Sequence, residues 1–193
     1  MVRMEQHTAE RILATARQLV IAGGYNGFSY ADIAAVVGIR KPSIHHHFPS
    51  KADLVQALVA GYRDDLAAGL AHFENLSPDA AVQLQSYIAT WEACITDGSM
   101  PFCLGAQLAA ELPALPPEVA VEVKAHFRLL AAWLTEVLAR GAQQGRFRLT
   151  DSAELEAEGI MATVHGAMLS ARAYGTPATF GLIVGPLLQR LII

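Results

Sequence analysis

Proline and glycine in this 193-residue chain fall largely between stretches of helical apolar periodicity. No convincing run alternates apolar and polar residues with the period of two that marks a half-buried strand. The chain contains 34 alanines and many Leu, Glu and Gln residues, which favour helix. The sequence therefore predicts an all-α fold of about nine helices.

The predicted helices are bounded by recognisable start and stop residues. Gly23 and Gly24 end the first helix, Ser29 caps the second with Asp32 three residues later, and Gly38 ends it. Ser50 caps the fourth helix. The expected ranges are 8–22, 30–37, 41–46, 51–73, 79–96, 101–112, 118–143, 152–174 and 177–193.

Length and hydropathy limit the class of protein. The chain suits one compact unit or two small ones, and no run of 18 apolar residues predicts a membrane span. Residues 1–10 lack the apolar core of a secretory signal, so we expect a cytoplasmic protein without a membrane partner. Two cysteines, Cys94 and Cys103, are too few for a disulfide framework. The mean hydropathy of +0.31 indicates apolar surface buried against another chain.

Charge is distributed unevenly along the sequence. Residues 1–51 carry a net charge of +3, and the rest carries −7, which gives the total of −4. A basic end on an acidic body favours contact of that end with an anion. Chance asymmetry is the alternative, because the charges are few.

The basic end contains two short predicted helices joined through Val37, Gly38 and Ile39. Gly38 suits a left-handed turn, and the pair resembles a helix-turn-helix motif. The second helix begins Arg40-Lys41-Pro42-Ser43, so cations and a hydroxyl stand where such helices meet base edges. Ile44 and Phe48 are expected to face the core.

The stretches Phe28–Ala34, Val37–Ile39 and Lys41–Leu54 resemble the DNA-binding domain of tetracycline-repressor-type (TetR family) regulators. The resemblance covers about 50 residues. It implies a homodimer with a three-helix DNA reader in residues 1–51 and a ligand-binding and dimerisation domain in residues 52–193. It also implies a transcriptional regulator, most simply a repressor released from a near-palindromic double-stranded operator by a small apolar or electrophilic effector.

The resemblance also assigns candidate DNA-binding residues. Those near DNA in the recognition helix are Lys41, Pro42, Ser43, His45 and His46, and those expected at phosphates are Ser29, Tyr30 and Lys51. Family members often have Tyr where this chain has His45. A charged His45 would strengthen phosphate contact as the pH falls.

Metal binding and catalysis are alternatives that the sequence favours less. Three consecutive histidines, His45 to His47, point about 100° apart on a helix and do not converge on one ion. No H-E-x-x-H motif occurs, and the sequence shows no signature of the positioned base or oxyanion site that a Cys–His hydrolase would need. We therefore expect no catalytic residue, no metal and no cofactor, with a helical enzyme or carrier as the alternative class.

Cys103 follows Pro101 and Phe102 in the expected first turn of a helix, where a thiolate is favoured. The segment Phe102–Glu111 resembles a branch of the family that includes sensors of reactive electrophiles. Two interpretations stay open: a reactive sensor thiol, or a small buried apolar residue. No Lys or Arg lies near Cys103 in the sequence, which favours the second.

Candidate effector contacts are the large apolar residues of the middle helices, each of which could equally be core. They are Tyr87, Trp91, Met100, Phe102, Cys103, Phe127, Trp133 and Met161. The many apolar and few charged residues of this region favour a hydrophobic or aromatic effector.

The last two helices are the expected dimer interface. Small residues recur at helical spacing in one of them, and the other carries Arg190 as its only charge between 180 and 193. Packing within the same chain is the alternative. The candidate interface residues are Gly159, Ala162, Gly166, Ser170, Phe180, Ile183 and Leu187.

Overall fold

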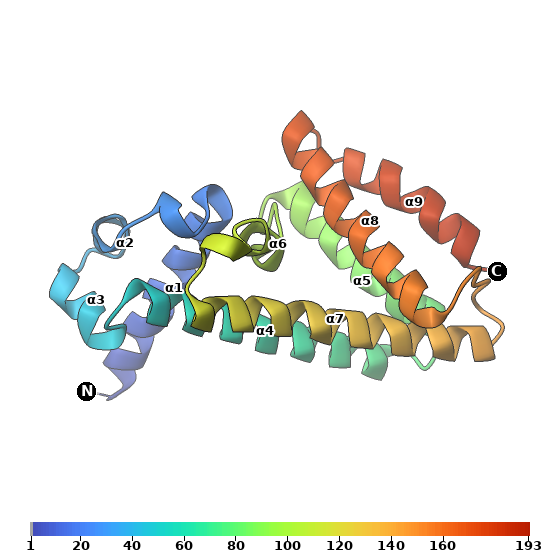
Figure 1. Cartoon of the computed structure of the whole chain (residues 1–193), viewed down its shortest axis with the longest axis horizontal. Coiled ribbons are helices and arrows are strands. Elements are labelled where there is room, and N and C mark those ends of the chain that lie inside the picture. Colours follow the sequence, from blue (N-terminus) through green and yellow to red (C-terminus); the bar gives the residue numbers. More distant parts are fainter. Residues whose placement is uncertain (1) are drawn as a thin grey trace. The chain divides into compact units, whose positions relative to one another are not determined.

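The computed structural model describes residues 2–193, with side chains from His7 onward, so Arg3 and Glu5 of the N-terminal charge count lie outside the described side chains. Nine α-helices occupy most of these residues (Figure 1), which confirms the predicted class. The chain forms two compact units, residues 1–64 with 104–126 and residues 65–103 with 127–193. The boundary expected at residue 51 falls inside the first unit.

The first unit begins with α1 (Val2–Gly23), the short 3-10 turn η1 (Tyr25–Gly27), α2 (Tyr30–Val37) and α3 (Lys41–His47). It continues through the first part of α4 (Lys51–Leu76), α6 (Leu104–Ala109), the 3-10 turn η2 (Leu112–Ala114) and the first part of α7 (Pro117–Gln143). Its core is apolar and drawn from each of the first four helices: Ile12, Ala16, Val20, Ile33, Ile44, Leu54 and Val55.

Residues 104–126 join the N-terminal helices through a carboxylate. Glu111 Oε2 accepts a hydrogen bond from the Tyr25 backbone N–H at 3.0 Å, and Gln107 Nε2 donates to Glu111 Oε1 at 3.2 Å. Gly24, at φ +75°, lies against this carboxylate so closely that a Cβ there would overlap it. This contact explains why the segment belongs to the N-terminal unit, although Glu111 is 86 residues from Tyr25 in the sequence.

The second unit contains the rest of α4 and α7, α5 (Ala80–Asp97), α8 (Ala153–Tyr174) and α9 (Thr179–Leu191). Helices α8 and α9 pack side by side (Figure 1). The end of α9 is held to the α7–α8 loop, where Phe147 and Ile192 form an isolated antiparallel bridge. Pro186 lies inside α9, four residues after Leu182, whose carbonyl would otherwise receive a backbone N–H.

Two sequence expectations about α6 were wrong. The helix begins at Leu104 and not at Pro101, and it ends at Ala109. Phe102, Cys103 and Leu104 are all buried, and three consecutive buried side chains do not fit one face of a helix. Pro113 then turns the expected end of the helix into the separate turn η2.

None of the described helices is long and apolar enough to cross a lipid bilayer.

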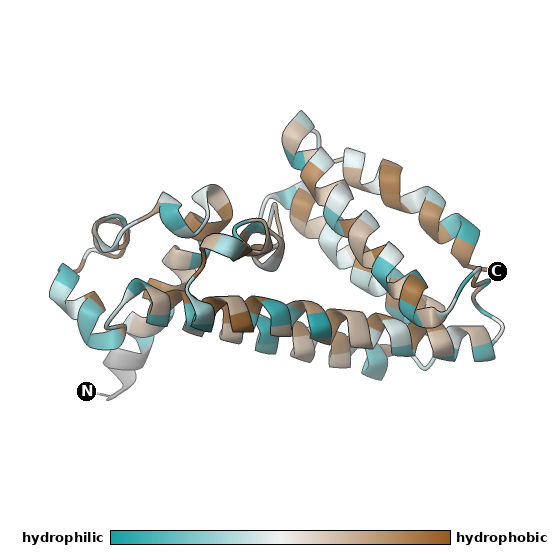
Figure 2. Ribbon diagram, viewed as in Figure 1, coloured by the Kyte–Doolittle hydropathy of each residue, from teal (hydrophilic) through white to brown (hydrophobic). Residues whose placement is uncertain are grey.

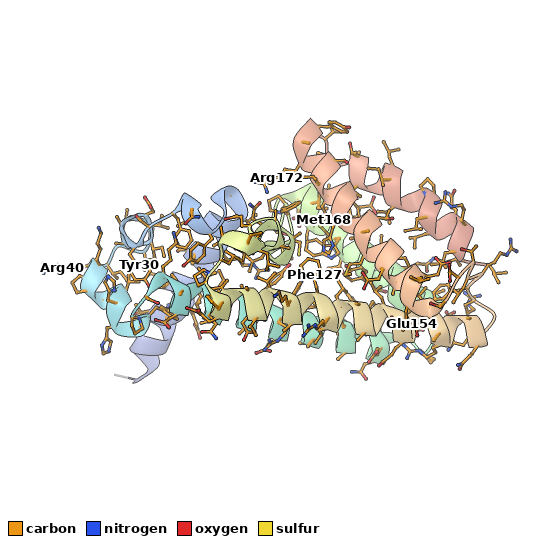
Figure 3. The ribbon with its side chains drawn as sticks, viewed as in Figure 1. Tyr30, Arg40, Phe127, Glu154, Met168 and Arg172 are labelled. Carbon is orange, nitrogen blue, oxygen red and sulfur yellow. The ribbon has the colours of Figure 1, made fainter. Side chains whose placement is uncertain are left out.

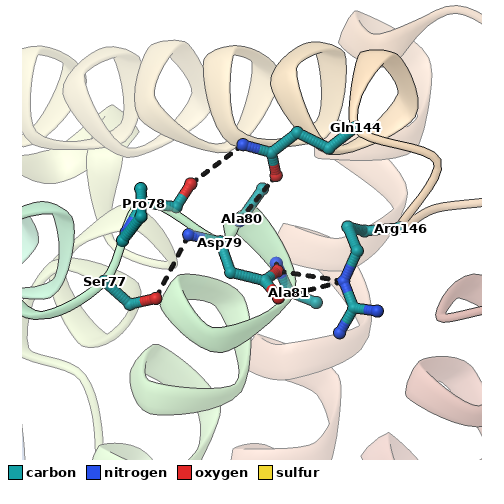
Figure 4. Close-up of polar contacts among 7 residues, drawn as sticks. All are labelled: Ser77, Pro78, Asp79, Ala80, Ala81, Gln144 and Arg146. Carbon is teal, nitrogen blue, oxygen red and sulfur yellow. Dashed lines mark hydrogen bonds and ion pairs between the residues drawn. The ribbon is translucent and has the colours of Figure 1, made fainter.

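The start of α5 is fixed by polar contacts with the loop after α7 (Figure 4). Asp79 caps the helix by accepting from Ala81 N–H at 2.8 Å, and Arg146 Nε lies 3.0 Å from Asp79 Oδ2. Gln144 Oε1 accepts from Ala80 N–H at 3.0 Å, and its Nε2 donates to the Pro78 carbonyl at 2.9 Å. A shallow surface hollow of about 240 Å³ is lined by Pro78, Asp79, Gln144 and Arg146.

We predict that Asp79→Asn lowers the melting temperature at neutral pH but not at strongly acidic pH. Desolvation raises the pKa of Asp79, but the Ala81 N–H and the Arg146 guanidinium outweigh it and leave that pKa below its ordinary value. Because the pKa of Asp79 is lower in the folded than in the unfolded chain, its carboxylate stabilises the fold at pH values above the unfolded-state pKa. This stabilisation is lost as the pH falls through the folded-state pKa. Thermal melts of both proteins at neutral pH and at about pH 3 test this. If the melting temperatures of the natural protein and Asp79→Asn differed by the same amount at both pH values, the prediction would be wrong.

Candidate nucleic-acid interface and effector region

The helix-turn-helix is built by local capping. The Ser29 hydroxyl donates to Asp32 Oδ2 at 2.7 Å and accepts from the Ala31 N–H at 3.2 Å, and the Ser29 N–H donates to Asp32 Oδ2 at 2.7 Å. These bonds from Ser29 hold the pKa of Asp32 below its ordinary value, so the cap stays charged at neutral pH. Gly38 ends α2 at φ +73° and turns the chain into α3.

Helix α3 buries one face and exposes the other. Ile44 is 0% exposed and anchors the helix in the core, while Phe48 is half-buried. The N-terminal residues point to solvent, and Arg40 lies at the outer edge of this unit (Figure 3). Four of the five candidate recognition residues are exposed and Ser43 is half-buried: Lys41, Pro42, Ser43, His45 and His46. Arg40 joins them, although our candidate set left it out; its charge beside Lys41 was the available signal.

The expected phosphate-contacting residues are held by contacts inside the unit. The Tyr30 hydroxyl donates to the carbonyls of Phe48, at 2.8 Å, and Ser50, at 2.6 Å. Lys51 Nζ donates to the Phe28 carbonyl and lies 4.1 Å from the centre of the Phe28 ring. These bonds fix the turn that follows α3 relative to the start of α2.

Burial changes the titration of two of these groups. Burial, and then the charge of Asp53 and the proximity of Tyr25, raise the pKa of Tyr30 to about 12. Burial lowers the pKa of Lys51, while Asp32 and Glu111 oppose that change. Tyr30 therefore remains protonated at neutral pH, as its bonds to the two carbonyls require.

His45 is oriented by two neighbours. Its ring lies 4.7 Å from the Tyr30 ring, centre to centre, and its Nδ1 lies 3.0 Å from the Pro49 carbonyl oxygen. Protonated Nδ1 would donate to this carbonyl and leave Nε2 for a contact elsewhere. Among the described residues, no group of three or more His, Cys, Asp or Glu side chains is arranged to hold a metal ion.

The candidate effector residues lie in the second unit and are mostly buried. Tyr87, Trp91, Phe102, Cys103, Trp133 and Met161 are buried, and Met100 and Phe127 are half-buried. Tyr87 of α5 and Trp133 of α7 contact each other, with ring centres 5.7 Å apart. Phe73 of α4 lies 6.5 Å from Trp133.

Two polar residues of α8 also reach this region, and sequence reasoning did not select them. His165 lies 5.3 Å from the Phe127 ring, and burial lowers the pKa of His165, opposed by a bond to the Met161 backbone. The Arg172 guanidinium lies 5.0 Å from the centre of the Phe102 ring. No sequence signal pairs Arg172 with residue 102, because tertiary packing alone joins them.

Cys103 precedes α6 and does not lie in its first turn. The helix-dipole argument for a thiolate therefore fails, since α6 has only six residues. The sulfur is buried, and the Arg172 side chain stacks on the preceding residue. A cation is thus placed one residue away, where the sequence had none nearby.

The candidate interface residues divide by exposure. Gly159, Ala162 and Gly166 of α8 are exposed, together with Ile183 of α9, while Ser170 and Leu187 are half-buried. Phe180 is 0% exposed and belongs to the core of its own chain. Leu182, which the candidate set left out, is 75% exposed.

Comparison with known proteins agrees with this arrangement. Residues 12–58 match the model of bacterial regulatory proteins of the tetR family, and residues 80–184 match the tetracyclin repressor-like C-terminal domain. The HTH-type transcriptional repressor NemR of Escherichia coli K12 is 26% identical over 172 residues, which cover 87% of this chain and 85% of NemR.

Solved structures agree as well. A TetR family transcriptional regulator from Agrobacterium tumefaciens is 57% identical, with a TM-score of 0.96 over 98% of this chain and all of that one. A TetR transcriptional regulator from Legionella pneumophila is 33% identical, with a TM-score of 0.84 over 94% of this chain and 96% of that one. The chain therefore belongs to the tetR family of DNA-binding transcriptional regulators.

Proposed function

We propose that this protein is a cytoplasmic homodimeric repressor that leaves its operator when a small effector binds the C-terminal domain. In this proposal residues 1–51 read DNA, and residues 52–193 bind the effector and form the dimer. The observation that carries it is the start of α3, where Arg40 and Lys41 are exposed and Ser43 is half-buried, on a helix anchored by buried Ile44. This is the end of a recognition helix that meets base edges in the major groove.

The operator is expected to be a near-palindrome. A two-fold dimer presents two copies of α3, so the half-sites match the spacing of the two helices. Binding neutralises phosphates and releases counterions, so affinity should fall steeply as salt rises.

The exposed stripe of α8 supports dimerisation. Leu155, Gly159, Ala162, Gly166 and Leu169 are all exposed and alternate at spacings of four and three residues. That spacing is the seam along which two helices pack, and the small residues allow close approach. Exposed apolar residues of α9, Leu182 and Ile183, would extend the surface, and Figure 2 shows hydrophobic residues along both helices. Exposed on a monomer, such a stripe would favour aggregation.

Two modes of release are compatible with the buried aromatic region. A reversible apolar ligand would bind among its rings. An electrophile would modify Cys103, and Arg172 on the neighbouring Phe102 would favour the thiolate. In either mode the effector shifts the population between two conformations with different operator affinity.

A mobility-shift titration tests the function. The full chain is titrated against DNA from upstream of its own gene and of the neighbouring gene, at fixed salt, before and after treatment with N-ethylmaleimide. Specific binding supports the regulator, and loss on treatment in the natural protein but not in Cys103→Ser assigns the thiol switch. If N-ethylmaleimide leaves specific DNA binding unchanged, the effector is a reversible ligand. If DNA selected from a random pool also shows no preferred sequence, the proposal is wrong.

We predict different effects for three substitutions at the DNA surface. Lys51→Ala should weaken binding to all DNA sequences alike, since it removes one phosphate contact. It should also reduce by about one the slope of the logarithm of the binding constant against the logarithm of the salt concentration. Lys41→Ala and Ser43→Ala should also relax sequence preference, at about 1–3 kcal/mol for a lost base contact. Binding titrations over a salt series measure both. Lys124→Ala, an exposed lysine of α7, is the control and should change neither. An unchanged salt slope in Lys51→Ala would exclude its phosphate role.

A further inference from the structure

The aromatic contact between α5 and α7 contains two buried hydrogen-bond donors without acceptors. The Tyr87 hydroxyl and the Trp133 indole Nε1 are each buried, and within the part of the chain that the structure describes neither donates to an acceptor. The residues are 3% and 7% exposed, and their rings are tilted against each other by 56° at 5.7 Å. Buried donors are nearly always paired, so two in one contact require an explanation.

Both groups are available as hydrogen-bond donors. An indole N–H can only donate. Burial is the main cause that raises the pKa of Tyr87, and the Trp91 side chain opposes it only in part, so the Tyr87 hydroxyl also remains protonated. Trp91, one turn further along α5, is a third aromatic residue with only an N–H to offer, and it is also buried. The cluster therefore presents donors inside an apolar wall and needs an acceptor.

Two described arginines beside these helices already contact other groups of the chain, and one of them, Arg172, lies 5.0 Å from the centre of the Phe102 ring. Arg140 lies seven residues after Trp133 on α7, and its guanidinium donates to Gln83 Oε1 at 2.6 Å and lies 3.8 Å from Glu74. A carboxylate placed at the rings would give up its hydration and would have to draw one of these arginines from its present contacts. A neutral acceptor oxygen would accept hydrogen bonds from the same donors without the desolvation of a charge.

From these observations we propose that the effector is a small, neutral, largely apolar molecule with a carbonyl oxygen that accepts hydrogen bonds from Tyr87 Oη and Trp133 Nε1. The proposal rests on the proposed function, because it assigns the chemical class of the effector for the same region. It places a ketone or aldehyde oxygen at the two donors and the hydrocarbon part among Trp91 and the surrounding rings.

The test uses two pairs of probes that differ only in the acceptor. Cyclohexanone is compared with methylenecyclohexane, and acetophenone with α-methylstyrene, in each of which a CH₂ group replaces the oxygen. Binding to the full chain is measured by calorimetry and by the indole N–H signals in NMR spectra. The chain has two tryptophans, so Trp133→Phe assigns the two signals. Cyclohexanecarboxylate tests an anionic acceptor.

We expect at least one ketone to bind about tenfold or more tightly than its hydrocarbon partner and to move the Trp133 indole proton downfield. Tyr87→Phe should reduce that preference several-fold while leaving the melting temperature of the free protein equal or higher, because it removes an unpaired hydroxyl. Tyr174→Phe makes the same change at an exposed tyrosine and should alter neither quantity.

Several outcomes would overturn the proposal. They are binding of neither ketone, equal binding within both pairs, a preference that survives in Tyr87→Phe, and tighter binding of the carboxylate. A clear fall in the melting temperature of free Tyr87→Phe would also do so, since the hydroxyl would then already be paired. Operator binding of the same preparations is measured separately. Ketone binding without any sequence-specific DNA binding would refute the proposed function and leave the carbonyl site standing.

Discussion

Ala162→Glu should convert the protein to a monomer and weaken operator binding by about 100-fold or more. In a dimer, binding of one subunit to its half-site holds the other subunit close to the second half-site, and a monomer loses this increase in affinity. Ala162 is exposed at the middle of the α8 stripe, so the substitution does not disturb the core of its own chain. In a dimer it would bury two carboxylates against each other across the two-fold axis. Light scattering gives the mass, and a binding titration gives the affinity.

The matched control is Ala132→Glu, the same change at an exposed helical position of α7. It should leave the mass, the melting temperature and the operator affinity unchanged. A dimeric Ala162→Glu protein with full affinity would show that the α8 stripe is not the interface. Gly159→Ala refines the test: a Cβ added at Gly159 would meet no atom within 4 Å, so the substitution is harmless to the chain itself but crowds a close helix pair.

Gly141→Ala should destabilise the fold by about 2–4 kcal/mol, from the upper part of the usual range for overpacking to beyond it, because a rigid ring blocks the new methyl. A Cβ at Gly141 would lie 2.1 Å from Phe147 Cδ2 and 2.3 Å from Cε2. Phe147 is buried and its N–H donates to the Gly141 carbonyl at 3.3 Å, so the ring has no free direction in which to move. Chemical denaturation of the free protein measures the change.

The same substitution should also weaken the dimer. Phe147 bridges to Ile192, and the neighbouring backbone bonds, Arg148 N–H to Leu191 and Ile193 N–H to Arg146, hold the end of α9. Moving the ring loosens α9, which carries part of the proposed interface.

Gly69→Ala is the control for Gly141→Ala. Gly69 is also helical but has nothing within 4 Å of a new Cβ, so alanine there should stabilise by up to about 1 kcal/mol. Opposite signs at the two glycines are the expected result. Destabilisation of similar size at both would mean that contact with Phe147 does not explain the effect, because helix propensity alone would stabilise both variants.

Local signals were enough to predict most of the helices. The caps at Ser29 and Gly38 act within a few residues, so α2 has its predicted bounds, and the ends of α7 also lie within one residue of their predicted positions. The recognition helix was also predictable, because buried Ile44 is followed by exposed His45 and His46, which the helical period places on other faces. Expectations failed where distant residues decide, as at Pro101, where burial of three consecutive side chains delays α6 until Leu104.

The sequence by itself determined the helical class, the capped helix-turn-helix and the family, because these depend on residues close together in the chain. Only the tertiary structure decided which candidate residues are used inside the chain and which remain exposed. It buried Phe180 and exposed Leu182, tied Lys51 to the Phe28 carbonyl, and set Arg172 on Phe102 beside Cys103. The physical reason is that burial, unpaired donors and charge contacts depend on side chains brought together from distant helices, and a linear pattern contains no record of those distances.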